Sequence, residues 1–110
     1  MKARRFYVYI LSDHAGTLHV GVTSNLVLRV FEHKAEQRDA GVTGSGAVRL
    51  VYFESTTEVH AALEREKELK RWVRREKRAL IQAQNPTWRD LAGDWFQPPV
   101  ANRGRARPAS

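Results

Sequence analysis

The sequence contains no cysteine, which excludes disulfide bonds, thiolate zinc sites and cysteine nucleophiles. It also lacks any apolar run near the roughly 20 residues that a membrane-spanning helix needs. The N-terminal stretch MKARRFYVYIL places basic residues before a short apolar run. Tyrosines break that run and no small-residue cleavage site follows, so it favours a first strand over a signal peptide. We therefore expect a cytoplasmic protein without a membrane partner.

What the chain has in excess is positive charge. Nineteen Lys and Arg against 12 Asp and Glu give a net charge of +7 and a pI near 10.4. Such a surplus favours a polyanionic partner, namely DNA, RNA or an anionic membrane surface, although an ordinary basic surface also fits. The 110 residues leave room for one domain, which we expect over residues 1–96. A disordered basic tail is expected over 97–110.

Local signals predict six elements in the order strand-strand-helix-strand-helix-helix. Aromatic and β-branched runs indicate strands, and apolar residues at helical spacing indicate helices. Asn25 is placed to cap the first helix, and Asn85-Pro86 ends the third. Ser55 and Glu58 fit a capping box before the second helix. The predicted strands are 6–11, 18–22 and 48–54, the helices are 26–39, 57–72 and 75–84, and 87–96 is a final turn that packs its aromatic residues.

This order predicts an α+β fold in which helices flank a small three-stranded, mostly antiparallel sheet. The first helix should bury one face of the chain against that sheet. The second helix, over 57–72, should do the same with a second apolar stripe. The stripe residues are Leu26, Val27, Val30 and Phe31 in the first helix, and Val59, Ala62, Leu63, Leu69 and Val73 in the second.

A carboxylate interrupts the second stripe. At about 100° per residue, Glu66 falls near the centre of the stripe, whereas Glu64 and Glu68 point away from it. A buried, unpaired carboxylate is unfavourable, so it requires a basic partner, a raised pKa or a metal ion. Two readings stay open at this point. One is an internal salt bridge, for example to Arg29, and the other is a single ligand to Mg²⁺, which one or two carboxylates commonly hold.

Two further groups of polar residues carry potential chemistry. Arg29 and His33 lie four residues apart, on one flank of the first helix, where they either face solvent or contact a phosphate and carry a proton. In the first strand Tyr9 shares a face with Tyr7. In the second strand Gly21 indicates close approach of backbone or ligand.

Basic residues are concentrated from the second helix onward, and such surfaces bind phosphate without reading bases. Trp72 lies among them, where it either packs the helix or stacks on an unpaired base. Trp88 and Trp95 fit a core or a lid better. The residues expected to contact nucleic acid here are Lys67, Lys70, Arg71 and Arg74.

Together these segments resemble the GIY-YIG nuclease superfamily, most of all its small stand-alone bacterial branch. The resemblance spans about residues 5–91. Its segments are YVYIL at 7–11, LHVGVTSNLVLRVFEHK at 18–34, LVYFE at 50–54, ALEREKELKRW at 62–72 and NPTWRDL at 85–91. By position, they supply Tyr9 for the "GIY" element, His19, Val20 and Gly21 for "YIG", Arg29 and His33 on the helix, Glu66 as metal ligand and Asn85 as the late polar residue near the site, where Asn85 is expected to contact nucleic acid.

The resemblance implies metal-assisted phosphodiester hydrolysis, with Glu66 holding Mg²⁺ or Mn²⁺. Arg29 is then expected to neutralise charge in the transition state, and Tyr9 to act as the general base. The chain departs from the family pattern where His19 replaces the "YIG" tyrosine, and His19 is itself a candidate base. It also departs at 42–46, where two aromatic residues are missing from the loop, and at Tyr7, which replaces the "GIY" glycine.

Two functions from different classes follow. The first is a metal-dependent endonuclease that cleaves DNA with weak sequence specificity, in repair or a related pathway and with targeting by a protein partner. The second is a non-catalytic nucleic-acid-binding module on a decayed scaffold. Duplex, branched and single-stranded DNA stay open as substrates, as does RNA. A membrane-surface role is disfavoured because Glu66 interrupts the apolar face that it requires.

Overall fold

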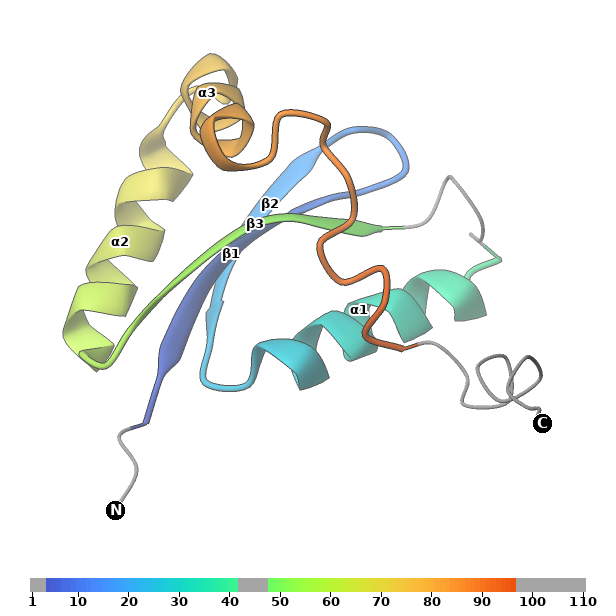
Figure 1. Cartoon of the computed structure of the whole chain (residues 1–110), viewed down its shortest axis with the longest axis horizontal. Helices are drawn as coiled ribbons and strands as arrows, with labels where there is room; N and C mark the ends of the chain where they lie inside the picture. The colour runs from blue at the N-terminus through green and yellow to red at the C-terminus, as the bar shows by residue number, and fades with distance from the viewer. Residues whose placement is uncertain (1–3, 42–47, 97–110) are drawn as a thin grey trace, which may run out of the picture.

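The structure, a computed structural model, describes residues 4–41 and 48–96. Six elements follow in the predicted order and form one antiparallel sheet with the strand order β2-β1-β3, which confirms the predicted α+β fold (Figure 1). The loop around Val42, Thr43 and Gly46 and the tail over 97–110 lie outside the described residues, so those predictions stay open. The elements are β1 (Phe6–Ser12), β2 (Leu18–Thr23), α1 (Leu26–Asp39), β3 (Arg49–Thr56), α2 (Val59–Arg71) and α3 (Arg74–Gln84).

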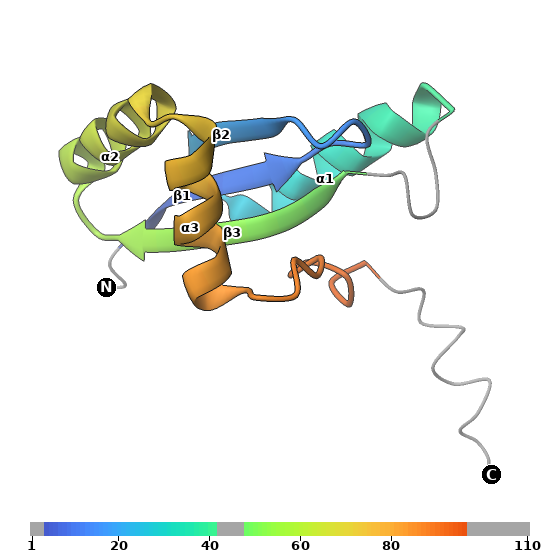
Figure 2. The ribbon, with the colours of Figure 1, turned by 90° about the horizontal axis from the view of Figure 1, so that it is seen from above.

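Helices cover both faces of the sheet, with α1 on one side and α2 and α3 on the other (Figure 2). Successive side chains of the central strand point to opposite faces. Tyr9 and Leu11 therefore pack with Leu26 of α1. Val8 packs with Leu69 of α2 on the other face. No helix in the described part of the chain is long and apolar enough to cross a membrane.

The apolar stripes of α1 and α2 are narrower than predicted. In α1, Leu26 and Val30 are buried, but Val27 and Phe31 are 52% and 46% exposed. In α2, Ala62 and Leu69 are buried, whereas Val59 and Leu63 are exposed. Val73, the last predicted stripe residue, is also exposed and lies beyond α2, in the N-cap position of α3. A sheet of only three strands is too narrow to cover a whole helix face, so the flanks of each stripe remain in solvent.

The capping box predicted at Ser55 and Glu58 is wrong. Strand β3 continues through Ser55 to Thr56, because β1 pairs with it as far as Phe6, opposite Thr56. Helix α2 then begins later, with Glu58 in the N-cap position. The hydroxyl of Thr56 accepts a hydrogen bond from the Glu58 backbone N–H at 3.1 Å. Strand pairing has thus taken Ser55, the residue that the local sequence assigned to the helix cap.

Residues 85–96 bond to the start of β3 at its outer edge. The backbone N–H of Leu91 donates to the Leu50 carbonyl at 2.8 Å, and the carboxylate of Asp90 accepts from the Leu50 N–H at 3.0 Å. Asp90 also accepts a hydrogen bond at 2.6 Å from Lys34 of α1. An unpaired strand edge invites association with other chains, and this segment satisfies the backbone groups of Leu50 at that edge internally. The opposite edge of the sheet, strand β2, is where the polar residues gather.

Candidate active site at the edge of strand β2

A polar pocket of about 280 Å³ opens beside strand β2, between α1 on one face of the sheet and α2 on the other. Four elements contribute to it. It brings together the predicted catalytic residues and the predicted metal ligand, although their roles stay predictions. The lining residues are Tyr9, His19, Val20, Gly21, Val22, Arg29, His33 and Glu66.

Gly21 gives Tyr9 its place in this pocket. The two residues are paired across β1 and β2, and the ring of Tyr9 lies over Gly21. A Cβ on Gly21 would come within 2.4 Å of both Cζ and the hydroxyl oxygen of Tyr9, closer than such atoms pack. This glycine does mark a close approach, but what approaches is the tyrosine side chain and not the backbone or ligand that the sequence suggested. Tyr9 also makes an edge-on ring contact with His33, at 6.3 Å between centroids.

Helix α1 presents Arg29 and His33 one turn apart. The side chain of Asn25 caps the helix as predicted, accepting from the Leu28 N–H at 3.1 Å. Arg29 donates to Glu32 at 3.1 Å, and that bond, followed by Tyr9, raises the pKa of Arg29. Burial, and then the charge of Arg29, lowers the pKa of His33. The lowered pKa favours the neutral imidazole of His33, in which one ring nitrogen is able to accept a proton.

Glu66 reaches the pocket from α2, on the opposite side of β2. Its side chain is 18% exposed, and its carboxylate lies 3.1 Å from the ammonium of Lys70, one turn along the helix. Arg29, the example partner that the sequence suggested, is instead paired with Glu32. Because Lys70 is 56% exposed, its ion pair with Glu66 is weak and easily exchanged.

The donor set around Glu66 fits only one kind of metal site. Among the described residues, no group of three or more His, Cys, Asp or Glu is placed to hold an ion. A site built wholly from protein ligands therefore does not fit the pocket. A single carboxylate with waters and substrate phosphate oxygens does fit, and this is how Mg²⁺ is commonly held.

Asp13 is a site residue that sequence reasoning missed. One of its carboxylate oxygens lies 2.9 Å from Nε2 of His19. The other accepts from the backbone N–H groups of Ala15 and Thr17, both at 2.9 Å, and so closes the turn between β1 and β2. These bonds, first of all the one from His19, lower the pKa of Asp13. The turn-forming stretch SDHAGT was the available signal, since an aspartate there commonly accepts backbone hydrogen bonds.

The basic residues predicted to contact nucleic acid divide into two groups. Lys67 and Arg71 are exposed on α2. Lys70 pairs with Glu66, and Arg74 donates to the Gly16 carbonyl at 2.9 Å, which ties the start of α3 to the turn between β1 and β2. Their contacts with nucleic acid stay a prediction. Trp72 packs against the core with the Arg65 guanidinium 5.4 Å from its ring centroid, as a helix-packing residue does.

The nucleic-acid contact predicted for Asn85 is corrected to a structural role. Asn85 is 3% exposed and does not line the polar pocket. Its amide donates to the carbonyls of Val51 and Arg89 at 3.0 and 2.9 Å, and its oxygen accepts from the Arg89 N–H at 3.2 Å. Val51 is the residue that the register skips where β3 bulges against β1, opposite Ile10 and Leu11. Asn85 thus supplies a hydrogen bond to the backbone carbonyl of Val51, the extra residue of the bulge.

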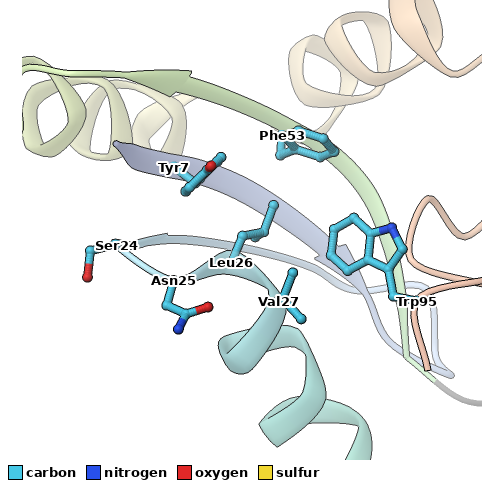
Figure 3. Close-up of a pocket in the computed structure, with 7 residues that line it drawn as sticks. All are labelled: Tyr7, Ser24, Asn25, Leu26, Val27, Phe53 and Trp95. Atoms are coloured by element: carbon cyan, nitrogen blue, oxygen red, sulfur yellow. The ribbon is translucent and has the colours of Figure 1, made fainter. Parts of the chain in front are cut away.

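A second cavity, of about 290 Å³, is apolar and lies near the start of α1 (Figure 3). Phe53 stands between Tyr7 and Trp95, with ring centroids 6.4 Å from each. Its walls offer little to a phosphate, so this cavity is not the candidate site for hydrolysis. Trp95 forms part of its wall, whereas Trp88 packs against the core. The lining residues are Tyr7, Ser24, Asn25, Leu26, Val27, Phe53 and Trp95.

Comparison with known proteins identifies the family of this chain. A family described as "GIY-YIG catalytic domain" matches residues 5–79. A UPF0213 protein of Natronomonas pharaonis is 39% identical over 75 residues, which are 68% of this chain and 88% of the relative. A UPF0213 protein of Syntrophus aciditrophicus is 40% identical over 81 residues, which are 73% and 92%.

A solved structure has the same fold. The solution NMR structure of a UPF0213 protein from Bacillus halodurans is 25% identical and superposes with a TM-score of 0.54. The match covers 82% of this chain and 97% of that one. With the family match over most of the described residues, these relatives leave one conclusion: the chain belongs to the GIY-YIG family, a nuclease family, alongside the UPF0213 proteins.

Proposed function

We propose that this chain is a metal-dependent endonuclease that hydrolyses DNA phosphodiester bonds with weak sequence specificity. The observation that carries the proposal is the polar pocket at β2, where one carboxylate, one guanidinium, a phenol and two imidazoles converge from four elements. Family membership supports a nucleic-acid substrate in general. We place the activity in the cytoplasm, a location with which the cysteine-free composition is compatible.

In this proposal, each group has a separate task. Arg29 binds the scissile phosphate and neutralises charge that develops on it. Tyr9, His19 and His33 orient the attacking water and accept its proton. Glu66 would hold Mg²⁺ or Mn²⁺, which would stabilise negative charge on the phosphate and the leaving oxygen. The weak pairing of Glu66 with Lys70 keeps this carboxylate available.

Weak sequence specificity follows from the kind of surface beside the pocket. Lys67 and Arg71 are exposed on the helix that carries Glu66, and the chain has a net charge of +7. Lysine and arginine on such a surface bind phosphates whatever the bases between them. Duplex and branched DNA are therefore the substrates to try first, with RNA as the comparison.

A second candidate is a nucleic-acid-binding module without catalysis. It is favoured by His19, which stands where the family pattern has a tyrosine. If that exchange removed the chemistry, the basic surface would still bind phosphate, and binding would not depend on Glu66.

A single assay separates the two candidates. Supercoiled plasmid and branched DNA are incubated with the parent protein, Glu66→Ala and the control Glu64→Ala, in Mg²⁺ and in Mn²⁺. Glu64 lies on the same helix but is exposed away from the pocket. We expect the parent and Glu64→Ala to nick DNA, and Glu66→Ala to lose on the order of 100-fold or more in rate while still binding. Equal DNA shifts by all three, without cleavage in either metal, would replace the nuclease with the binding module.

A further inference from the structure

The turn between β1 and β2 holds the Asp13 carboxylate in one orientation. One oxygen accepts two backbone N–H groups, from Ala15 and Thr17, and the other faces Nε2 of His19 at 2.9 Å. The Asp13 side chain is 20% exposed, against 54% for His19. A carboxylate fixed at three points is preorganised, so it orients the imidazole without losing entropy of its own.

This contact selects one tautomer of His19. Bonds to the carboxylate lower the pKa of Asp13, so it is ionised at neutral pH and acts only as an acceptor. The hydrogen of a neutral His19 ring must then sit on Nε2. Nδ1 is consequently left unprotonated, with a lone pair that can accept a proton.

His19 also lies in the right place. It lines the polar pocket together with Arg29 and Glu66, the proposed phosphate and metal ligands. It also lines the adjoining cavity of about 270 Å³, which contains Asp13. His19 thus lines both the cavity that Asp13 lines and the pocket in which the proposed function places the phosphate. The titratable and charged groups around the ring are Asp13, Tyr9, Arg29, His33, Glu36 and Glu66.

We propose that Asp13 is a positioning residue that holds His19 with Nδ1 free to accept the proton of the attacking water. The inference rests on the proposed nuclease function, and it assigns to the histidine the role that the family pattern would give to a tyrosine. In this step a water oxygen forms a bond to phosphorus while its proton passes to Nδ1. The phosphorus–oxygen bond to the leaving strand breaks, the leaving oxygen takes a proton from solvent, and His19 later returns its proton to solvent.

Electrostatics favour His19 over the other candidate bases. His33 is next to Arg29, whose positive charge helps to lower the pKa of His33 and opposes a second positive charge there. Tyr9 is a phenol, which needs a strongly lowered pKa to act near pH 7. At His19, by contrast, the Asp13 carboxylate lies 2.9 Å from Nε2 and holds the ring with Nδ1 unprotonated.

The test uses Asp13→Asn, which changes one hydrogen bond and keeps the turn. An asparagine oxygen can still accept from the Ala15 and Thr17 N–H groups, whereas its NH₂ donates to His19 Nε2 and so moves the ring hydrogen to Nδ1. Nitrogen-15 NMR of the imidazole reads the tautomer without any reaction. We expect Nε2–H in the parent and Nδ1–H in the variant. We also expect the cleavage rate at saturating DNA to fall roughly 100-fold to 10,000-fold, with the DNA dissociation constant unchanged.

Two further variants keep the test decisive. His19→Gln leaves the Asp13 turn intact and should lose as much rate, with no added loss when it is combined with Asp13→Asn, because the two residues act as one unit. Asp39→Asn, at the exposed end of α1, is the matched control and should cleave like the parent. Nδ1–H in the parent, or parental cleavage by Asp13→Asn, overturns the inference alone. A parent that binds DNA and never cleaves it overturns the proposed function, and this inference with it.

Discussion

At the scale of single residues, the position of Tyr9 in the pocket requires a glycine at position 21. A methyl group there would meet the Tyr9 ring at 2.4 Å, so Gly21→Ala must displace the tyrosine from the pocket. We expect cleavage to fall on the order of 10-fold to 100-fold, since small displacements of a catalytic group reduce rate strongly. Plasmid nicking measures this. Folding should persist, because β2 is an edge strand and the clash meets only a side chain.

Gly93→Ala is the control for that substitution. Its added Cβ would come 3.2 Å from the Asp90 carbonyl oxygen, in the segment that covers β3, away from the pocket. It should cleave at the parental rate. Parental activity in Gly21→Ala, with an unchanged melting temperature, would show that the position of Tyr9 is irrelevant to the reaction.

The lowered pKa of His33 predicts how the stability of the fold depends on pH. Burial and Arg29 lower its pKa in the folded protein, whereas the unfolded chain has an ordinary value near 6.5. Below that ordinary value the unfolded state binds more protons, so stability falls as the pH drops from about 6.5 toward the lowered pKa. Above about 6.5 the effect disappears.

Melting temperatures at pH 7.5 and pH 5 check this. His33→Gln should lose less stability on acidification than the parent does, because the group that resists protonation has been removed. His60→Gln, on the exposed surface of α2, is the control and should follow the parent. If His33→Gln and the parent lost equal stability, the surroundings of His33 would not be those described.

Periodicity found Glu66 because a helix with regular phase puts each residue at a fixed angle, and one carboxylate stood out from an apolar stripe. The sequence could not identify its partner. Lys70 lies on the same helix, but ion pairing depends on side-chain conformation, and the angular position of a residue around a helix does not give that conformation. Asp13 was missed for a related reason, since its contact with His19 exists only once the turn has folded.

At the scale of elements, Asn85 joins the end of α3 to the bulge in β3. Asn85→Ala would leave the Val51 and Arg89 carbonyls and the Arg89 N–H without their partner. We expect the free energy of unfolding to decrease by about 1–3 kcal/mol, the usual effect of stranding buried polar groups. Urea denaturation measures it, with the exposed neighbour Gln84→Ala as control.

The same variant separates a structural role from a nucleic-acid contact. Folded Asn85→Ala should bind DNA with parental affinity, because the side chain is 3% exposed and faces backbone carbonyls. A large loss of DNA affinity with unchanged stability would restore the contact that sequence similarity suggested.

The boundaries of elements were predictable where local chemistry decides them. Asn25 begins α1 through its own side chain, and the turn formers after β1 end that strand. Local chemistry failed at Ser55, because long-range pairing with β1 extended the strand past a residue that suits a helix start. The bulge at Val51 also has no local signal, since it is defined by the partner strand.

At the scale of the whole molecule, the two edges of the sheet have different surroundings. Residues 85–96 bond to the start of the β3 edge through Asp90 and Leu91, whereas at the β2 edge Arg29 of α1 and Glu66 of α2 line one pocket. Element order can be predicted from sequence, but which edge of a sheet stays open depends on tertiary packing. The sequence therefore predicted which residues form the candidate site, but not that the site lies at the edge of β2.

Salt dependence tests whether the basic face of α2 contacts the substrate. Binding of DNA releases counterions, so the logarithm of affinity falls with the logarithm of salt by about 0.9 for each phosphate contacted. The double variant Lys67→Gln and Arg71→Gln should lower that slope by up to about 2 and weaken binding equally for unrelated sequences. Fluorescence anisotropy in Ca²⁺ or EDTA, at several salt concentrations, measures the slope without cleavage.

The control separates local contact from total charge. Arg38→Gln combined with Arg4→Gln removes the same charge from exposed positions on α1 and before β1. If α2 carries the phosphate contacts, this control keeps nearly the parental slope, because screening weakens charges that lie more than about 10 Å from the DNA. If both double variants lowered the slope equally, the overall charge of +7 would hold the DNA, and not Lys67 and Arg71 on α2 in particular. The closeness of these two residues to Glu66 would then no longer support a phosphate bound at the pocket.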